Sequence, residues 1–262
     1  MAVPVVLVHG AWQGSWSFDE LVPALAEFGR TGVAVDLPGN GADSTPPEDV
    51  SLDRYLDALT STIDDLGGRA AVVGHSGGGL VATALAERSP DRVAAVVYLA
   101  GMCLPNGESF GELQARVGGP VGISDDIVVA DDGLTSSVPT DAAIRYFLHD
   151  LPPATARRLA AQLTSQPEAG RLITSPTTPA NFGRLPKLYV EATDDRSISV
   201  DAQRAMQALA PDMEVVSLDT GHVPQVVDPN GVAAAIADFV DRVERSSPAT
   251  PTDALATPFT HR

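Results

Sequence analysis

The sequence predicts an α/β fold in which a mostly parallel sheet is flanked by helices. Short apolar runs alternate with segments of helical periodicity along most of the 262-residue chain, a pattern typical of a parallel sheet with helices on both faces. Hydrophobic residues make up 44% of the chain and charged residues 19%, which favours a folded globular protein. A chain of this length can fold as one domain around a large core.

Six runs are predicted to be buried strands because they are short, apolar and rich in β-branched residues. They lie at residues 4–8, 33–35, 70–73, 93–99, 187–191 and 214–218. Helical periodicity is found at residues 17–28, 52–66, 77–88, 199–209 and 230–244. The sequence therefore predicts a six-stranded parallel sheet whose strands are joined by crossover helices.

The alternation stops between residues 104 and 184. Helical stretches are expected there at residues 142–149 and 154–163, on either side of Pro152-Pro153, and no strand is expected. We interpret this segment as a helical cap inserted into the sheet domain. The predicted organisation is a core of residues 1–103 and 185–245, a helical cap of residues 104–184, and a flexible, Pro- and Thr-rich C-terminal tail of residues 246–262.

The bulk chemistry limits the partners of the chain. Its formal net charge of −17 argues against nucleic acid and anionic membranes, because like charges repel. The N-terminal residues have neither the basic region of a signal peptide nor an apolar run long enough to span a membrane. The expected location is therefore cytoplasmic. Cys103 is the one cysteine, so no intrachain disulfide forms, and a buried, inert thiol is expected.

The most informative stretch is the corner between the third predicted strand and its helix. Gly74-His75-Ser76-Gly77-Gly78 fits the pattern G-x-S-x-G, which between a strand and a helix forms a sharp turn that exposes a nucleophilic serine. Small flanking residues let the strand and the helix approach closely. A phosphate-binding loop is excluded because Leu80 and Val81 stand where its Lys-Ser/Thr pair would be. A dinucleotide-binding site is also disfavoured, because such a site carries a carboxylate after the next strand and this sequence has none there.

A serine nucleophile needs a histidine base and an acid that orients it, and in this fold both follow the serine in sequence. Of the five histidines, His9 and His75 precede Ser76, His149 lies in the predicted cap and His261 lies in the tail. His222, in the loop after the last strand, is therefore the predicted base. The acid is expected after the preceding strand, where Asp194 and Asp195 are adjacent, and composition does not separate them.

Five motifs carry a resemblance to a known family, namely VLVHGAWQGSW, DLPGNG, GHSGGG, YVEATDDRSISVDAQRAM and DTGHVPQVVDP. The chain resembles the α/β-hydrolase superfamily, in particular the branch of plant methylesterases, the salicylate-binding protein, hydroxynitrile lyases and their bacterial esterase relatives. The similarity covers nearly the whole chain before the tail. It implies that Asp195, the second acidic residue of its motif, completes the catalytic triad.

Acyl transfer also requires two backbone donors for the oxyanion. The amide of Gly77, directly after the serine, is one candidate, and the resemblance points to the amide of Ala11 as the other. Trp12, Phe147 and Val223 are predicted to line the substrate pocket. Val223 stands where hydroxynitrile lyases carry a lysine that stabilises cyanide, which argues against lyase activity.

These observations predict a serine hydrolase that cleaves small carboxylic esters through an acyl-enzyme, with Ser76, His222 and Asp195 as the triad and with no cofactor or metal. The expected partner is a small-molecule ester. One alternative is a ligand receptor or cyclase of the same fold with weak or no hydrolysis, and another is a purely structural interaction module. The oligomeric state is left open, with a homodimer among the options.

Overall fold

A six-stranded parallel sheet forms the centre of the protein. The computed structural model describes residues 2–118 and 122–246. All neighbouring strands pair in parallel, in the order β2-β1-β3-β4-β8-β9, which confirms the predicted sheet. The strands are β1 (Val5–Val8), β2 (Gly32–Val35), β3 (Ala70–His75), β4 (Val93–Leu99), β8 (Lys187–Ala192) and β9 (Glu214–Leu218).

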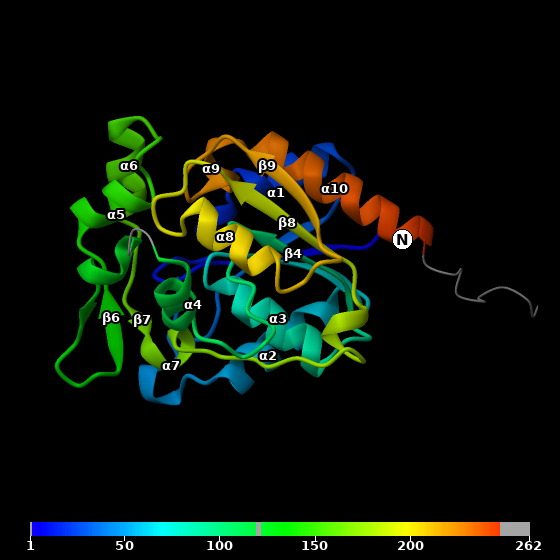
Figure 1. Ribbon diagram of the computed structural model, residues 1–262, viewed down its shortest axis with the longest axis horizontal. Helices are drawn as coiled ribbons and strands as arrows, with labels where there is room; N and C mark the ends of the chain where they lie inside the picture. The colour runs from blue at the N-terminus through cyan, green and yellow to red at the C-terminus, as the bar shows by residue number, and fades with distance from the viewer. Residues whose placement is uncertain (1, 119–121, 247–262) are drawn as a thin grey trace, which may run out of the picture.

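Helices cover both faces of this sheet, so the protein has three layers (Figure 1). On one face lie α1 (Leu21–Glu27) and α10 (Pro229–Ser246). On the other lie α2 (Leu52–Asp65), α3 (Gly78–Arg88) and α8 (Val200–Gln207). Alternate residues of β3 pack against the two helical layers, because successive side chains of a strand point to opposite faces. Ala71 and Val73 pack towards α1 and α10, and Val72 packs towards α2 and α3.

The helix predicted at residues 17–28 is divided in the structure. A 3-10 turn, η1 (Ser15–Phe18), precedes α1, and Asp19 and Glu20 separate the two. Pro23 explains where α1 begins, because proline has no amide hydrogen to donate and is tolerated only in the first turn of a helix. The remaining core helices lie within two residues of their predicted ends.

The expectation that residues 104–184 contain no strand is wrong. This segment holds a three-stranded antiparallel sheet in the order β5-β6-β7, separate from the central sheet. Its strands have only two or three residues, too few to show an alternating pattern in the sequence. The elements are α4 (Phe110–Val117), η3 (Gly122–Asp126), β5 (Val128–Val129), β6 (Thr135–Ser137), α5 (Thr140–Tyr146), α6 (Pro153–Ala160), β7 (Gln166–Pro167), α7 (Glu168–Arg171) and η4 (Phe182–Arg184).

Three further expectations concern the C-terminal tail, Cys103 and membrane spans. The last helix, α10, extends to Ser246, and the rest of the predicted flexible tail lies outside the described residues. Cys103 is buried, and burial raises the pKa of its thiol to about 12, so that the group stays protonated. Among the described residues, none of the helices combines the length and the apolar character needed to cross a bilayer.

The order of the strands determines which loops meet. Parallel strands end at one common edge, and ligands of α/β proteins bind beyond the carboxyl ends of the strands. β1 lies beside β3, so the loop at residues 9–14 borders the corner at Ser76. β8 lies beside β9, so the loop that carries Asp194 and Asp195 borders the loop of His222. The elements from α4 to α7 follow β4 and lie at this edge (Figure 1), whereas η4 packs at the C-terminal end of α3.

Candidate active site

The turn between β3 and α3 holds Ser76 in a left-handed backbone conformation, with φ of 51°. A non-glycine residue in this region costs on the order of 1 to 3 kcal/mol, which the surrounding structure must offset. Ser76 N–H donates to the Leu99 carbonyl at 3.3 Å, and the Ser76 carbonyl accepts from Met102 N–H at 2.8 Å. Both bonds join the turn to the end of β4 and to the residues that follow it.

Glycines let the turn be this sharp. A Cβ on Gly74 would lie 2.6 Å from the Gly78 carbonyl oxygen and from the Gly79 Cα. A Cβ on Gly78 would lie 2.5 Å from the His9 carbonyl oxygen and 2.6 Å from that of Val8. Because real Cβ atoms are not found at such distances, the start of α3 can approach both β3 and the end of β1 only without side chains. The loop after β1 is thereby placed beside Ser76.

The structure brings together Ser76, His222 and Asp195. His222 Nε2 lies 3.1 Å from Ser76 Oγ, and His222 Nδ1 lies 2.7 Å from Asp195 Oδ2. The other carboxylate oxygen of Asp195 accepts from the amides of Ser197 at 2.7 Å and Ile198 at 2.9 Å. Asp195 and His222 are both buried. This arrangement is consistent with a catalytic triad, in which the carboxylate fixes the tautomer of the imidazole.

Asp194, the alternative that composition left open, contacts a different histidine. Its carboxylate lies 3.1 Å from His149 Nε2, and its side chain is 60% exposed. The sequence did not predict this contact, because His149 lies in the inserted segment, 45 residues away along the chain. The two adjacent carboxylates therefore face different partners.

His75 is a feature of this site that the sequence reasoning set aside. Its Nε2–H donates to the main-chain carbonyl of His222 at 2.8 Å. Burial, together with the positive charge that His222 can carry, lowers the pKa of His75 to about 3, so its ring is neutral at physiological pH. A neutral ring donates to the loop of His222 without adding charge beside the imidazole. Its position next to the serine in GHSGG was the only signal in the sequence.

His9 shapes the loop after β1. Its Nδ1–H donates to the Gly10 carbonyl at 2.8 Å, and its Nε2 accepts from Leu37 N–H at 3.2 Å. These two bonds require the neutral form, and burial lowers the pKa of His9 accordingly. His9 therefore joins the loop after β1 to the loop after β2.

Two free backbone amides meet beside Ser76. A Cβ on Gly77 would lie 3.8 Å from the Ala11 nitrogen, so the two residues are neighbours. Within residues 2–118 and 122–246, neither the Ala11 nor the Gly77 N–H donates a hydrogen bond. Gly77 also precedes the first residue of α3, where the helix dipole favours negative charge. The two amides are thus available to an anionic oxygen.

Trp12 connects this loop to the inserted segment. It has φ of 62°, and three hydrogen bonds hold it. Its N–H donates to Gln166 Oε1 at 3.1 Å, its indole Nε1–H to Ser136 Oγ at 3.2 Å, and its carbonyl accepts from Thr164 N–H at 2.9 Å. The position of Ala11, the residue before it, therefore depends on the inserted segment as well as on the core.

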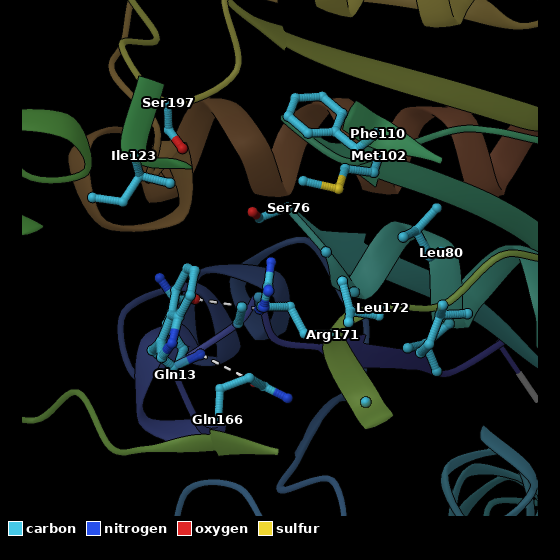
Figure 2. Close-up of a pocket in the computed structure, with 18 of the residues that line it drawn as sticks. Gln13, Ser76, Leu80, Met102, Phe110, Ile123, Gln166, Arg171, Leu172 and Ser197 are labelled. Atoms are coloured by element: carbon cyan, nitrogen blue, oxygen red, sulfur yellow. Dashed lines mark hydrogen bonds between the residues drawn. The ribbon is translucent and has the colours of Figure 1, made fainter. Parts of the chain in front are cut away.

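A cavity of about 360 Å³ opens above Ser76 and His222. Figure 2 shows Ser76 between Ile123 and Ser197 on one side and Gln166 and Arg171 on the other. Trp12 and Phe147 are among the residues that line it. Val223 packs in one apolar cluster with Trp12 and Phe147 but does not line the cavity. The described residues hold no group of three or more His, Cys, Asp or Glu side chains suited to a metal ion.

Phe147 also covers the imidazole of His222. The two rings stack with their centroids 5.1 Å apart, and Phe147 stacks in turn on Trp12 at 6.1 Å. Such a cover keeps water from the imidazole and strengthens the electrostatic interactions beneath it.

The fold and this site define an α/β hydrolase. The family model "Alpha/beta hydrolase family" matches residues 5–235, and the chain belongs to that family. It is 30% identical to a pyrethroid hydrolase of Sphingobium wenxiniae, covering 90% of this chain and 87% of that one. It is 31% identical to the esterase PIR7B of Oryza sativa subsp. japonica, covering 80% and 85%.

A solved structure agrees with the sequence relatives. The crystal structure of a pyrethroid hydrolase from Sphingobium faniae JZ-2 matches with a TM-score of 0.80 at 27% identity, over 92% of this chain and 98% of that one. Plant methylesterases match over most of this chain as well. The resemblance to this branch of the α/β hydrolases is therefore confirmed.

The depressed pKa of His75 predicts a loss of stability in mild acid. Below about pH 6.5 the unfolded chain binds a proton on His75 that the folded chain does not bind until about pH 3, so the free energy of unfolding falls as the pH falls. Between pH 7 and 5 this one group lowers it by about 2 kcal/mol. Urea unfolding at the two pH values should show His75→Gln losing about 2 kcal/mol less than the wild type. Equal losses would contradict this assignment.

Proposed function

We propose that the protein is a serine hydrolase that cleaves small carboxylic esters through an acyl-enzyme. The observation that carries the proposal is the continuous chain from Asp195 through His222 to the Oγ of Ser76, at 2.7 and 3.1 Å. Ser76 lies on the floor of a cavity and beside two free amides. The names of its relatives, a pyrethroid hydrolase and an esterase, support ester hydrolysis.

In the first half of the reaction, Ser76 Oγ attacks the ester carbonyl while His222 Nε2 takes the hydroxyl proton. Asp195 holds the Nδ1–H of the resulting imidazolium and balances its charge. The carbonyl oxygen becomes an oxyanion, and the amides of Ala11 and Gly77 donate to it. His222 then returns the proton to the leaving alcohol as the C–O bond breaks. The acyl group remains on Ser76.

In the second half, water replaces the alcohol. His222 takes a proton from the water, the hydroxide attacks the acyl carbonyl, and the same two amides stabilise the second oxyanion. The acid leaves when His222 protonates Ser76 Oγ, which restores the starting state. The ester, one water molecule and the residues of this chain balance both halves.

The cavity supports uncharged, largely apolar esters as substrates. Its volume of about 360 Å³ lies in the range of small-molecule sites. The charged residue Arg171 on its wall is paired with Glu168, at 2.7 and 2.5 Å. The wall is otherwise built mainly of aliphatic, aromatic and glycine residues.

We infer that residues 104–184 act as a cap that contributes to substrate selection. Residues of this segment, among them Phe110, Ile123, Phe147, Gln166 and Ile173, line the cavity together with Ser76 and His222. A segment in this position excludes water and shapes the entrance to a site. The division of the chain into core and cap follows from this role.

The nucleophile is tested by replacing Ser76 with alanine. Hydrolysis of p-nitrophenyl butanoate should fall by about four orders of magnitude or more, because the covalent route is lost. A fluorophosphonate probe should label Ser76 in the wild type and leave the variant unlabelled, as read by peptide mass spectrometry. A variant that retains wild-type turnover would contradict the proposal. A wild type that binds esters but is neither labelled nor active would favour the ligand-receptor alternative.

The two adjacent carboxylates offer a matched pair for testing the acid. Asp195→Asn should lower kcat by about four orders of magnitude, because the imidazole loses the partner that fixes its tautomer. Asp194→Asn should change kcat by less than about threefold, since its carboxylate is largely exposed and contacts His149. The measurement is steady-state hydrolysis of one p-nitrophenyl ester by both variants. The reverse order of effects would assign the acid to Asp194.

A further inference from the structure

Tyr55 brings a hydroxyl group to the wall of the cavity. It lies on α2 and is only 1% exposed. Its hydroxyl oxygen lies against Gly170, where an added Cβ would overlap it. Tyr55, Gly170 and Gln166 all line the cavity above Ser76. The mechanism above gives this hydroxyl no role.

The first neighbour of the Tyr55 hydroxyl is a hydrogen-bond donor. Asn40 Nδ2 donates to the Tyr55 oxygen at 2.7 Å. The orientation of this amide is fixed by a second bond, in which Nδ2 also donates to the Pro38 carbonyl at 3.1 Å. Turning the amide over would present Oδ1 to that carbonyl and break the bond. The Tyr55 oxygen therefore acts as the acceptor towards Asn40.

The second neighbour is also a donor. Gln166 Oε1 accepts from Trp12 N–H at 3.1 Å, so its Nε2 faces the other way. That Nε2 donates to the Pro167 carbonyl at 3.0 Å and lies 3.5 Å from the Tyr55 oxygen. The backbone bonds of Gln166 thus fix its orientation as firmly as those of Asn40. Both side chains present N–H groups to Tyr55.

The proton of the Tyr55 hydroxyl is left without an acceptor among the hydrogen bonds of the described residues. A buried donor without a partner carries a desolvation cost, so such groups usually have a specific purpose. The lining residues Leu37, Leu80, Val81 and Ile173 have apolar side chains, which cannot accept a hydrogen bond. Tyr55 lines the cavity, so a bound ligand can bring an acceptor to the hydroxyl from that side.

We propose that the Tyr55 hydroxyl donates a hydrogen bond to an oxygen atom of the substrate, at a distance from the bond that is cut. The preferred substrates are then apolar esters that carry a second acceptor oxygen, such as an ether, carbonyl or hydroxyl oxygen. The reaction at the scissile ester rests on the proposed function. Binding of the second oxygen does not, because Tyr55 is outside the group formed by Ser76, His222 and Asp195.

Gln166 links this recognition to the oxyanion amides. Its Oε1 holds the N–H of Trp12, which directly follows Ala11, and its Nε2 faces Tyr55. Figure 2 shows Gln166 on the cavity wall, with the bond to the loop after β1 drawn as a dashed line. Through Gln166, a substrate oxygen bound to Tyr55 is therefore linked to the loop of Ala11, whose amide is proposed to bind the reacting carbonyl.

The test is a comparison of isosteric ligands that differ in one atom. In p-nitrophenyl octanoate and in octyl benzoate, each CH₂ of the chain except the one bonded to the ester group is replaced in turn by oxygen, so that the acyl and the alcohol sides are both sampled. Dissociation constants are measured by calorimetry on Ser76→Ala, which does not turn the ligands over. Relative to its CH₂ parent, at least one oxygen analogue should bind about three- to tenfold tighter, the range of one neutral hydrogen bond.

Tyr55→Phe in the same Ser76→Ala background should bind parent and analogue within about twofold of each other. The variant keeps the ring, and Asn40 and Gln166 each keep one backbone acceptor, Pro38 and Pro167, so the fold is expected to persist. The matched control is Tyr98→Phe. That tyrosine is equally buried, but its hydroxyl is bonded to Thr83 at 2.7 Å, and its removal should leave the preference for the oxygen analogue unchanged.

Two results would overturn the proposal. One is the absence of any preference for oxygen along either chain, and the other is a preference that survives in Tyr55→Phe. Turnover of plain p-nitrophenyl octanoate by the wild type is measured separately. A lack of turnover alongside a Tyr55-dependent binding preference would reject the proposed function and retain this inference. Turnover without any preference for the oxygen analogues would support the proposed function and reject this inference.

Discussion

The left-handed backbone at Ser76 is the constraint on which the rest of the site depends. A serine adopts φ of 51° only because Gly74 and Gly78 let α3 begin in contact with β3 and with the end of β1. That contact places the amide nitrogen of Ala11 beside Gly77. One sharp turn thus exposes a hydroxyl group and brings two donors beside it, and the strain is offset by the packing of the surrounding sheet.

The imidazole of His222 is held from several sides. Asp195 accepts from one ring nitrogen, His75 donates to the main-chain carbonyl, and Phe147 stacks on the ring face. Keeping His75 neutral matters, because a second positive charge this close would oppose formation of the imidazolium. The inserted segment supplies Phe147 and, through its contacts with Trp12, also supports the loop of Ala11. Core and inserted segment therefore build one site together.

The sequence predicted those features that have a local or compositional signal. The six strands were recognisable because helices cover both faces of the sheet, which makes its strands continuous apolar runs. Ser76 was predicted from the turn motif, and His222 was predicted because the other four histidines lie at unsuitable positions in the sequence. The choice between Asp194 and Asp195 required the resemblance, because adjacent identical side chains differ only in tertiary contacts. The strands β5 to β7 were too short to recognise. The contact of Gln166 with Tyr55 joins residues 111 positions apart, and no local pattern encodes it.

The account is tested most directly by a crystal structure of the protein after reaction with diethyl p-nitrophenyl phosphate. This reagent phosphorylates an activated serine and leaves a tetrahedral phosphoryl group that mimics the oxyanion. We predict one adduct, on Ser76 Oγ, with its P=O oxygen within hydrogen-bonding distance of the amides of Ala11 and Gly77. An adduct on another residue, or a P=O oxygen that points away from both amides, would contradict the proposed arrangement.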